Sequence, residues 1–348
     1  DVSMGDLIDY LGMSSQTRSI ILYVESITGA REFMSAARAF SRTKPIVAYK
    51  GGRFAESAQA AASHTGALAG VDAVYDAAFK RAGIERINEV SDMFDCAELL
   101  ARKRTPKGDR LAVITNAGGP GVMTIDALMG RDGKIATLNE ETIKKLDACL
   151  PPFWSHGNPV DVLGDAPPDR YVDAINAVLD DDTVDAILVI LTPQAMTDPT
   201  ATAKAVARAA REVQKPVLAA WMGGSMVSEG VQALTKAGIP TYKAPEMAVR
   251  AFMHLVSYGR NQEILHVTPR DLPVDFQLDR KRLRGVFDTL LTEGNEILSE
   301  NVSKSFLEAY DIPVTRPMLA RSPEEAVRVA RDQCGYPVVM KIHSPDIT

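Results

Sequence analysis

The sequence predicts an α/β protein whose parallel sheets carry helices on both faces. Short, nearly continuous apolar runs, such as residues 19–24 and 110–115, are typical of strands buried on both sides. Helical patterns punctuated by glycine and proline alternate with these runs, which is the order expected of doubly wound sheets. At 348 residues the chain is also too long for one ordinary core, so we expect more than one domain.

Two α/β series follow each other along the chain, separated by a basic, turn-rich segment at residues 102–108. We therefore expect a first domain at residues 1–105 and a second at residues 106–265. The predicted strands of the first lie at residues 19–24 and 46–49, with helices at residues 31–40 and 71–82. Those of the second lie at residues 110–115, 186–191 and 216–220, with helices at residues 199–211, 226–237 and 244–258 and one ending near residue 129.

A stretch with two prolines and then a charged run, residues 266–297, is typical of a linker. A third unit occupies residues 298–348. Its pattern predicts helices at residues 299–310 and 323–331 and strands at residues 313–317 and 337–342. This unit is too small to form a nucleotide site alone, and the sequence begins with Asp1 rather than Met, so we expect a piece of a longer polypeptide.

The composition argues against several classes of partner. Hydrophobic residues make up 46% of the chain and charged residues 24%, which is globular usage. A net charge of -6, with no apolar run long enough to span a bilayer, argues against nucleic-acid and membrane partners. Three widely spaced cysteines suit free thiols in a reducing compartment, so we expect a cytoplasmic protein.

His64 is the first candidate for chemistry, because it lies in a small-residue loop before a predicted helix. A helix N-terminus offers unpaired N–H groups and about half a positive charge, which would hold an anion beside the imidazole. A neutral imidazole can attack a phosphoryl group if a carboxylate accepts the proton of its other nitrogen. Glu25 ends the first strand at the edge where such sheets bind ligands, so it is the candidate partner. From the residues alone, a capping or surface histidine is the commoner interpretation.

A second candidate is the glycine-rich turn at residues 116–121, between a predicted strand and a helix. Its Ala117, Gly118, Gly119 and Gly121 would let a phosphate approach the backbone. The turn lacks the spacings of the dinucleotide and Walker A motifs, so on its own a routine strand-to-helix turn is the simpler interpretation. Two such helix starts in consecutive domains, one of them with a histidine, together indicate a phosphate held between two positive helix ends.

Three further polar residues are weaker candidates. Asn158 and Asp161 lie in a turn-rich loop that could bind a substrate carboxylate, although such clusters are usually only turns. Lys341 could contact phosphate, or it could simply belong to the end of an amphipathic strand. The sequence has no His or Cys spacing typical of a metal site, so we predict none.

Six segments, taken together, point to a known family. They are residues 21–25, 44–47, 62–70, 115–121, 158–161 and 342–347. In this order they resemble the acyl-CoA synthetases (NDP-forming), of the acetate–CoA ligase (ADP-forming) type, which are related to succinyl-CoA ligase. The resemblance implies two flavodoxin-like, succinyl-CoA synthetase-like domains followed by the start of an ATP-grasp domain.

The resemblance also assigns roles to individual residues. It implies that His64 becomes phosphorylated, that Glu25 orients it, and that two helix starts grip the phosphate. The first of these helix starts is at Thr65 and Gly66, and the second is at Gly118 and Gly119. In the ATP-grasp part, the lysine that matches Lys341 contacts nucleotide phosphates.

The implied reaction is reversible and converts acyl-CoA, ADP and phosphate into a carboxylic acid, CoA and ATP, through an acyl phosphate and a phosphohistidine. CoA and ATP or ADP would then be small-molecule partners, with Mg²⁺ bound to the nucleotide, and homo- or hetero-oligomers are expected. Compared with the family pattern, most of a preceding CoA-binding domain and most of the ATP-grasp domain are missing. We therefore expect residues 1–348 by themselves to be inactive.

Two other functions compete with this one. Some relatives are fused to an acetyltransferase, so the chain could be the synthetase-like regulatory region of a protein lysine acetyltransferase that senses acyl-CoA. His64 and Glu25 favour a working phosphoryl site, because a pure sensor needs no nucleophile. A flavodoxin-like binding module without catalysis is the third hypothesis.

Overall fold

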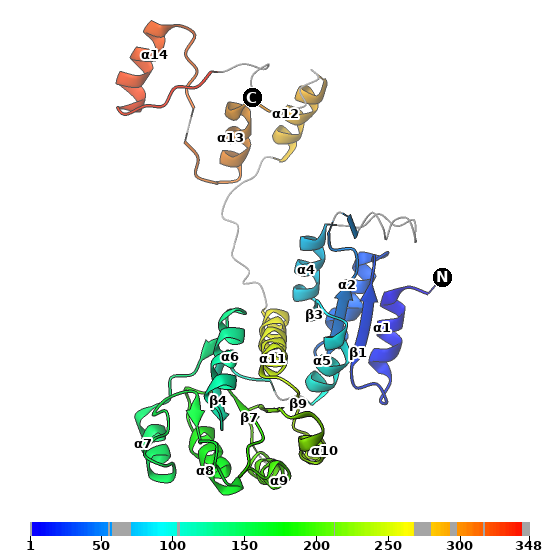
Figure 1. Ribbon diagram of the computed structural model, residues 1–348. Helices are drawn as coiled ribbons and strands as arrows, with labels where there is room; N and C mark the ends of the chain where they lie inside the picture. The colour runs from blue at the N-terminus through cyan, green and yellow to red at the C-terminus, as the bar shows by residue number, and fades with distance from the viewer. Residues whose placement is uncertain are drawn as a thin grey trace. The chain divides into compact units, whose positions relative to one another are not determined.

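A computed structural model describes residues 2–54, 56–57, 71–102, 105–211, 213–267, 280–292, 298–315 and 317–342. The chain forms two units, Asp1–Thr268 and Pro269–Thr348. The first unit contains two parallel sheets with their helices, and the second contains short helices (Figure 1). The predicted α/β class with parallel sheets is confirmed.

The first sheet has three parallel strands in the order β1-β2-β3. Its elements are α1 (Met4–Met13), β1 (Ile20–Val24), α2 (Ala30–Phe40), β2 (Ile46–Lys50), α4 (Asp72–Arg81), β3 (Glu85–Ile87) and α5 (Ser91–Ala101). In β2, Ile46 and Ala48 pack in a core with α1, α2 and α4, whereas Val47 packs on the opposite face. Because both faces are covered, successive residues of the strand are apolar.

The second sheet follows the order β5-β4-β7-β8-β9, and β6 also pairs with β4. Its elements are β4 (Arg110–Thr115), α6 (Gly118–Met129), β5 (Lys134–Ile135), α7 (Glu140–Cys149), β6 (Val160–Asp161), α8 (Pro168–Leu179), β7 (Ala186–Leu191), α9 (Pro199–Ala209), β8 (Val217–Trp221), η1 (Gly224–Val227), α10 (Ser228–Lys236), β9 (Thr241–Tyr242) and α11 (Pro245–His266). Helices α7 to α10 share a core with one face of this sheet, and α6 and α11 cover the other. The doubly wound arrangement therefore holds in this half as well.

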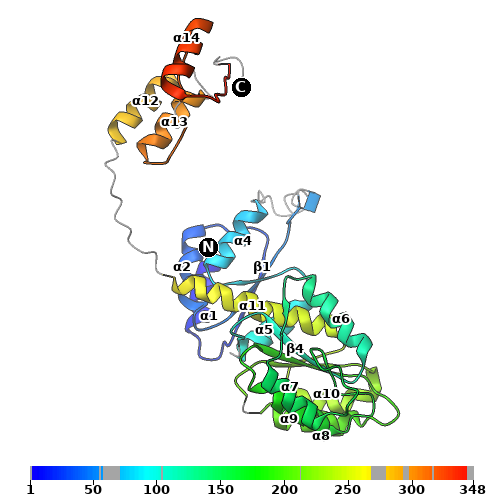
Figure 2. The same ribbon diagram turned by 90° about the vertical axis from the view of Figure 1, so that its left-hand side faces the viewer.

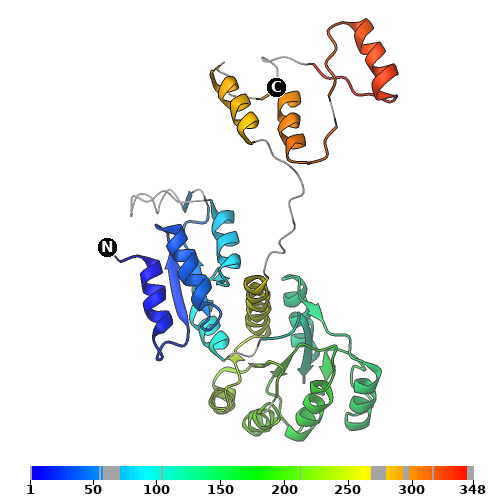
Figure 3. The ribbon, with the colours of Figure 1, turned by 180° about the vertical axis from the view of Figure 1, so that it is seen from behind.

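A layer of helices joins the two sheets. Residues of α5, α6 and α11 belong to one apolar cluster that also contains Val47 of the first sheet and Leu188 of the second. In Figures 2 and 3 the 22-residue helix α11 lies between the lobe of the first sheet and that of the second. The two sheets are consequently parts of one packed body and not two separately packed domains.

The second unit differs most from the sequence-based expectation. It contains α12 (Arg280–Thr292), α13 (Glu300–Ala309), α14 (Pro323–Val329) and a π-helical turn, η2 (Ala330–Cys334). Helix α12 lies inside the segment predicted as a linker. The strands predicted at residues 313–317 and 337–342 are wrong, because the described residues there are not in strands. A strand needs a hydrogen-bonded neighbour, and the described part of this unit forms no strand pair.

No helix within the described ranges combines the length and the apolar character needed to cross a membrane.

Candidate functional site

The N-terminus of α6 follows directly from β4 at the carboxyl edge of the second sheet. Ala117 is the N-cap, in an extended conformation, and its side chain makes no capping bond. Thr115 Oγ1 instead accepts a hydrogen bond of 3.1 Å from the Ala117 N–H. The first turn holds no acidic residue, so the positive end of the helix dipole is not offset by a side chain of its own.

The two leading glycines of α6 leave this helix end open. Gly118 and Gly119 are exposed, and a Cβ added at either would meet no atom within 4 Å among the described residues. Their N–H groups can therefore be approached closely by an anion. Gly121 is different, because a Cβ there would lie 3.4 Å from Pro159 Cβ and 3.4 Å from Thr115 Cγ2. Gly121 thus lets the helix pack against the next loop, rather than lining the open space.

Asn116, which the sequence analysis placed in the loop but not in the site, holds the neighbouring loop in position. Its side chain is buried, and its Nδ2 donates to the Thr192 carbonyl at 2.8 Å while its Oδ1 accepts from the Thr192 N–H at 2.9 Å. Gln194 Nε2 donates to the Asn116 carbonyl at 3.2 Å. The loops that follow β4 and β7 are thereby tied together beside the open helix end.

Asn158 and Asp161 use their side chains mainly within the loop. Asn158 Oδ1 accepts from the Val113 N–H at 2.9 Å, and its Nδ2 donates to the carbonyls of Leu111 and Ala136 at 2.9 and 2.8 Å. Both amide hydrogens of Asn158 are used in this way. Asp161 Oδ1 accepts from the Leu163 N–H at 2.9 Å, which stabilises a turn.

At the carboxyl edge of the first sheet, Glu25 lies next to the start of the segment that contains His64. Gly51 donates to the Val24 carbonyl at 2.9 Å, and a Cβ at Gly51 would lie 3.9 Å from Glu25 Cγ. The segment between β2 and α4 begins beside Glu25. His64, Thr65 and Gly66 lie outside the described residues.

Lys50, the last residue of β2, is a polar residue that the sequence analysis missed. Its side chain is almost completely buried, with 1% exposure, and its Nζ donates to the Gly51 carbonyl and lies 4.6 Å from the centre of the Tyr75 ring. Burial lowers the pKa of Lys50, whereas Asp72 raises it. A charged residue that ends an otherwise apolar strand was the signal available in the sequence.

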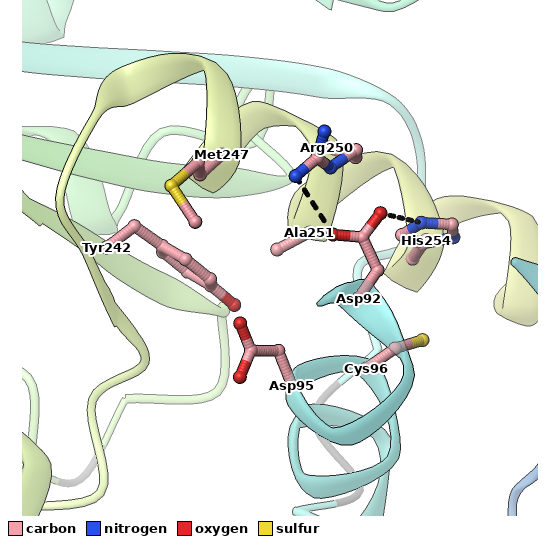
Figure 4. A pocket seen from close by; sticks show the side chains of 8 residues that line it. All are labelled: Asp92, Asp95, Cys96, Tyr242, Met247, Arg250, Ala251 and His254. Atoms are coloured by element: carbon pink, nitrogen blue, oxygen red, sulfur yellow. Dashed lines mark ion pairs between the residues drawn. The ribbon is translucent and has the colours of Figure 1, made fainter. Parts of the chain in front are cut away.

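A second polar cluster lies where α5 meets α11 (Figure 4). Asp92 pairs with Arg250 at 2.9 Å, and Glu85 of β3 lies 2.8 Å from His254 Nδ1. Burial raises the pKa of the Cys96 thiol, and the nearby carboxylates of Glu85 and Asp92 raise it further. The cavity here is about 10 Å³, which holds about one water molecule, so it is too small to be a substrate pocket. The contacts of Asp92 with Arg250 and of Glu85 with His254 instead join the two lobes.

Lys341 lies in the second unit and is described there by itself. Its Nζ pairs with Glu300 Oε2 at 3.1 Å, and both side chains are exposed. Hydrogen bonds from Lys304 and Lys341 lower the pKa of Glu300. Among the described residues, no group of three or more His, Cys, Asp or Glu side chains could hold a metal ion.

Three family models match consecutive parts of the chain. The succinyl-CoA ligase-like flavodoxin domain matches residues 1–100, the ligase-CoA domain residues 111–262, and the ATP-grasp domain residues 289–348. The order of the three domains is the order expected from the sequence, and the predicted domain types are confirmed.

Similar proteins carry related names. Acetate–CoA ligase (ADP-forming) I of Archaeoglobus fulgidus is 37% identical over 342 residues, which cover 98% of this chain and 48% of that protein. The alpha subunit of acetate–CoA ligase (ADP-forming) II of Pyrococcus furiosus is 40% identical over 266 residues, 75% of this chain and 58% of that subunit. The chain therefore spans about half the length of the curated relatives it matches.

A solved structure agrees with this family in fold and sequence. Acetyl-coenzyme A synthetase 1 of Ca. Korarchaeum cryptofilum, in complex with phosphate and ADP, aligns with a TM-score of 0.71 and 37% identity, covering 76% of this chain and 58% of that chain. Sequence, domain order and fold together show that this chain belongs to the ADP-forming acyl-CoA synthetases, the relatives of succinyl-CoA ligase that include the ADP-forming acetate–CoA ligases.

Proposed function

We propose that this chain carries the phosphate-transfer centre of an NDP-forming acyl-CoA synthetase. The full-length protein would convert acyl-CoA, ADP and phosphate reversibly into a carboxylic acid, CoA and ATP. The observation that carries this proposal is the open, glycine-led N-terminus of α6, in a chain whose relatives are named ADP-forming CoA ligases. An open positive helix end suits a phosphate or a phosphoryl group.

The proposed reaction consists of three transfers. Phosphate attacks the thioester carbonyl, the carbon–sulfur bond breaks, and CoA leaves as a thiol, which gives an acyl phosphate. A ring nitrogen of His64 then attacks the phosphorus atom, and the carboxylic acid leaves as the phosphorus–oxygen bond breaks. Finally, an oxygen of ADP takes the phosphoryl group from the phosphohistidine to form ATP.

In this proposal, residues of the chain orient His64 and hold the phosphate. Glu25 accepts a hydrogen bond from the second ring nitrogen of His64 and so fixes the tautomer that attacks phosphorus. The N–H groups of Gly118 and Gly119 hold the phosphate oxygens on one side, and Thr65 and Gly66 are the proposed partners on the other. Asp161 stays a candidate for substrate contact, whereas Asn158 and Gly121 act indirectly, since they hold and pack the loop.

The proposed small-molecule partners are CoA, an acyl group and ADP or ATP. Mg²⁺ bound with the nucleotide would offset phosphate charge, and Lys341 is the proposed nucleotide contact in the second unit. Acetate is the first acid to test, since relatives are named acetate–CoA ligases. The Pyrococcus furiosus relative is named a subunit, which supports the proposal of a homo- or hetero-oligomer, and we propose a cytoplasmic location.

Gly119→Ala in the full-length protein tests the helix end directly. The described neighbours leave space for the methyl group, and alanine favours a helix over glycine by up to about 1 kcal/mol, so thermal stability should stay the same or rise. The methyl group occupies the space through which phosphate would approach, so ATP formation from acetyl-CoA, ADP and phosphate should fall at least about tenfold.

Gly285→Ala is the matched control, because Gly285 of α12 is also exposed and helical, and a Cβ there would meet no atom of the described residues within 4 Å. It should gain similar stability and keep full activity. Wild-type activity in Gly119→Ala would contradict the assignment of the α6 N-terminus.

The alternative of a regulatory region in a lysine acetyltransferase gains no support from these relatives, which are named as CoA ligases and synthetases.

A further inference from the structure

Lys50 is unusual because its charged side chain is buried at the carboxyl edge of the first sheet, with 1% exposure. Lysine is rarely buried to this degree, since removing an ammonium group from water is costly unless other groups replace the water. Here Nζ donates to the Gly51 carbonyl and lies over the Tyr75 ring, at 4.6 Å from its centre. Burial lowers the pKa of the Lys50 amine, in agreement with this desolvation.

The other end of the same strand offers a contrast. Lys44 precedes β2, and its Nζ donates to the carbonyls of Leu11 and Ser14, at 3.1 and 2.5 Å, which closes the end of α1. These two hydrogen bonds give Lys44 a purely structural role. Lys50, at the edge where ligands of parallel sheets bind, contacts the first turn of α4 instead.

Tyr75 also contacts the segment that follows Glu25. Its hydroxyl oxygen accepts a hydrogen bond of 3.3 Å from the N–H of Ile27, two residues after Glu25. Its ring lies 6.1 Å from the ring of Phe79, edge to face, and so packs against the core. Lys50, Tyr75 and Ile27 therefore form a continuous chain of contacts from β2, through α4, to the segment after β1.

The start of α4 is held from a second side. Arg86 of β3 pairs with Asp72, the first residue of α4, at 2.6 Å, and lies 3.6 Å from Asp76. The helix turn that carries Tyr75 is thus anchored to the sheet, so the position of Tyr75 can determine the position of Ile27 and, through it, of Glu25.

We propose that Lys50 and Tyr75 are positioning residues that fix the Glu25 carboxylate relative to the strand end from which the His64 segment departs. This inference rests on the proposed function, because it concerns the efficiency with which Glu25 orients the nucleophile. In this role both residues act through Glu25 and need no contact with the substrate. A displaced Glu25 would slow phosphoryl transfer to His64 without weakening the binding of nucleotide, since a small misplacement in a catalytic constellation lowers the rate of the chemical step.

Three variants of the full-length protein test this proposal, with the initial rate of phosphohistidine formation from ATP as the readout. Tyr75→Phe keeps the ring and removes only the acceptor for Ile27, so the rate should fall about fivefold, as expected for one lost hydrogen bond. Lys50→Met should lower it by about tenfold or more. Lys50→Arg keeps the charge and its contact with the ring, and should recover part of the rate. The KM for ATP should be unchanged in all three.

Lys44→Met is the matched control, because it removes a lysine that lies just before the same strand, β2. It should lower the melting temperature at least as much as Lys50→Met does, while phosphohistidine forms at the wild-type rate. The proposal is overturned if Lys50→Met and Tyr75→Phe form phosphohistidine as fast as wild type, or if Lys44→Met slows it equally.

A further variant separates this proposal from the proposed function. His64→Asn should take up no label at all. Label that persists in His64→Asn would refute the proposed function itself, whereas loss of label there together with wild-type rates in the Lys50 and Tyr75 variants would refute the positioning role alone.

Discussion

At the scale of single residues, Asn158 completes the second sheet on the side of β4 that faces away from β7. β5 pairs with the first two residues of β4 and β6 with the last two, which leaves the middle of the strand open on that side. The amide group of Asn158 bonds to Val113, Leu111 and Ala136 and so supplies the missing partners. One side chain therefore makes hydrogen bonds that the main chain of a neighbouring strand would otherwise make.

Replacement of Asn158 by aspartate should be strongly destabilising. A carboxylate cannot donate to the carbonyls of Leu111 and Ala136 and would instead repel them, so we expect a loss of about 2–4 kcal/mol in the free energy of unfolding. Asn158→Ala should cost less, because it removes these hydrogen bonds without placing a charge beside the carbonyls, and the Leu111 carbonyl keeps its bond from the Ala136 N–H. Chemical denaturation measures both changes, and hydrogen exchange at the Val113 amide should accelerate in both. Equal stability of the aspartate variant and wild type would contradict this role.

Residue types in the sequence suggested a polar loop at Asn158 and Asp161, but they could not indicate which main-chain groups lack a partner. The same limit applies to Lys50. A lysine after four residues of apolar strand is normally a solvated end, and only the position of Tyr75 on α4 shows that the ammonium is covered. Such roles depend on contacts between segments that lie far apart in the sequence.

At the scale of elements, α11 is the helix that joins the two lobes. It contacts α6, β7, β8 and β9 of the second lobe, and α4, α5 and β3 of the first. Its polar contacts with the first lobe include His254 with Glu85, at 2.8 Å, and Asn261 Nδ2 with the Ile84 carbonyl, at 3.2 Å. The sequence pattern predicted this helix only as far as residue 258, and the remaining turns are the ones that carry Asn261 and Gln262 onto the first lobe.

Glu85 should make the stability of this contact depend on pH. Burial raises the pKa of the Glu85 carboxyl above its ordinary value of 4.5, and the hydrogen bond from His254 opposes this shift in part. The folded protein therefore binds this proton more readily than the unfolded chain does. Wild type should consequently lose stability relative to Glu85→Gln as the pH rises from about 4.5 through the raised pKa.

Melting temperatures of the two proteins across this pH range measure the effect. A difference between them that stays constant, or one that moves in favour of wild type as the pH rises, would contradict the direction of the pKa shift.

The long apolar runs were sufficient to predict β4 and β7, because strands covered on both faces need apolar residues at every position. The strands β3, β5, β6 and β9 have only two or three residues each, too few to show a pattern. The strands predicted at residues 313–317 and 337–342 were wrong for a different reason. Their residues have the right composition, but the described part of that unit offers no strand to pair with.

At the scale of the whole molecule, both parts of the candidate site lie at carboxyl edges of parallel sheets. This placement could be predicted from the alternation of strands and helices, since connections after each strand gather at that edge. Glu25 and the start of α6 were found in this way. The packing of α5, α6 and α11 into one layer between the sheets could not be predicted, because it depends on how helices from the two lobes fit together.

The central claim, that His64 accepts the phosphoryl group, is tested most directly with the full-length protein and ATP labelled on its γ-phosphate. Wild type should take up label that is labile to acid and stable to base, as expected for a phosphohistidine. The label should be released on addition of ADP, and His64→Asn should take up none. Label of the same stability in His64→Asn, or its absence in wild type, would contradict the account.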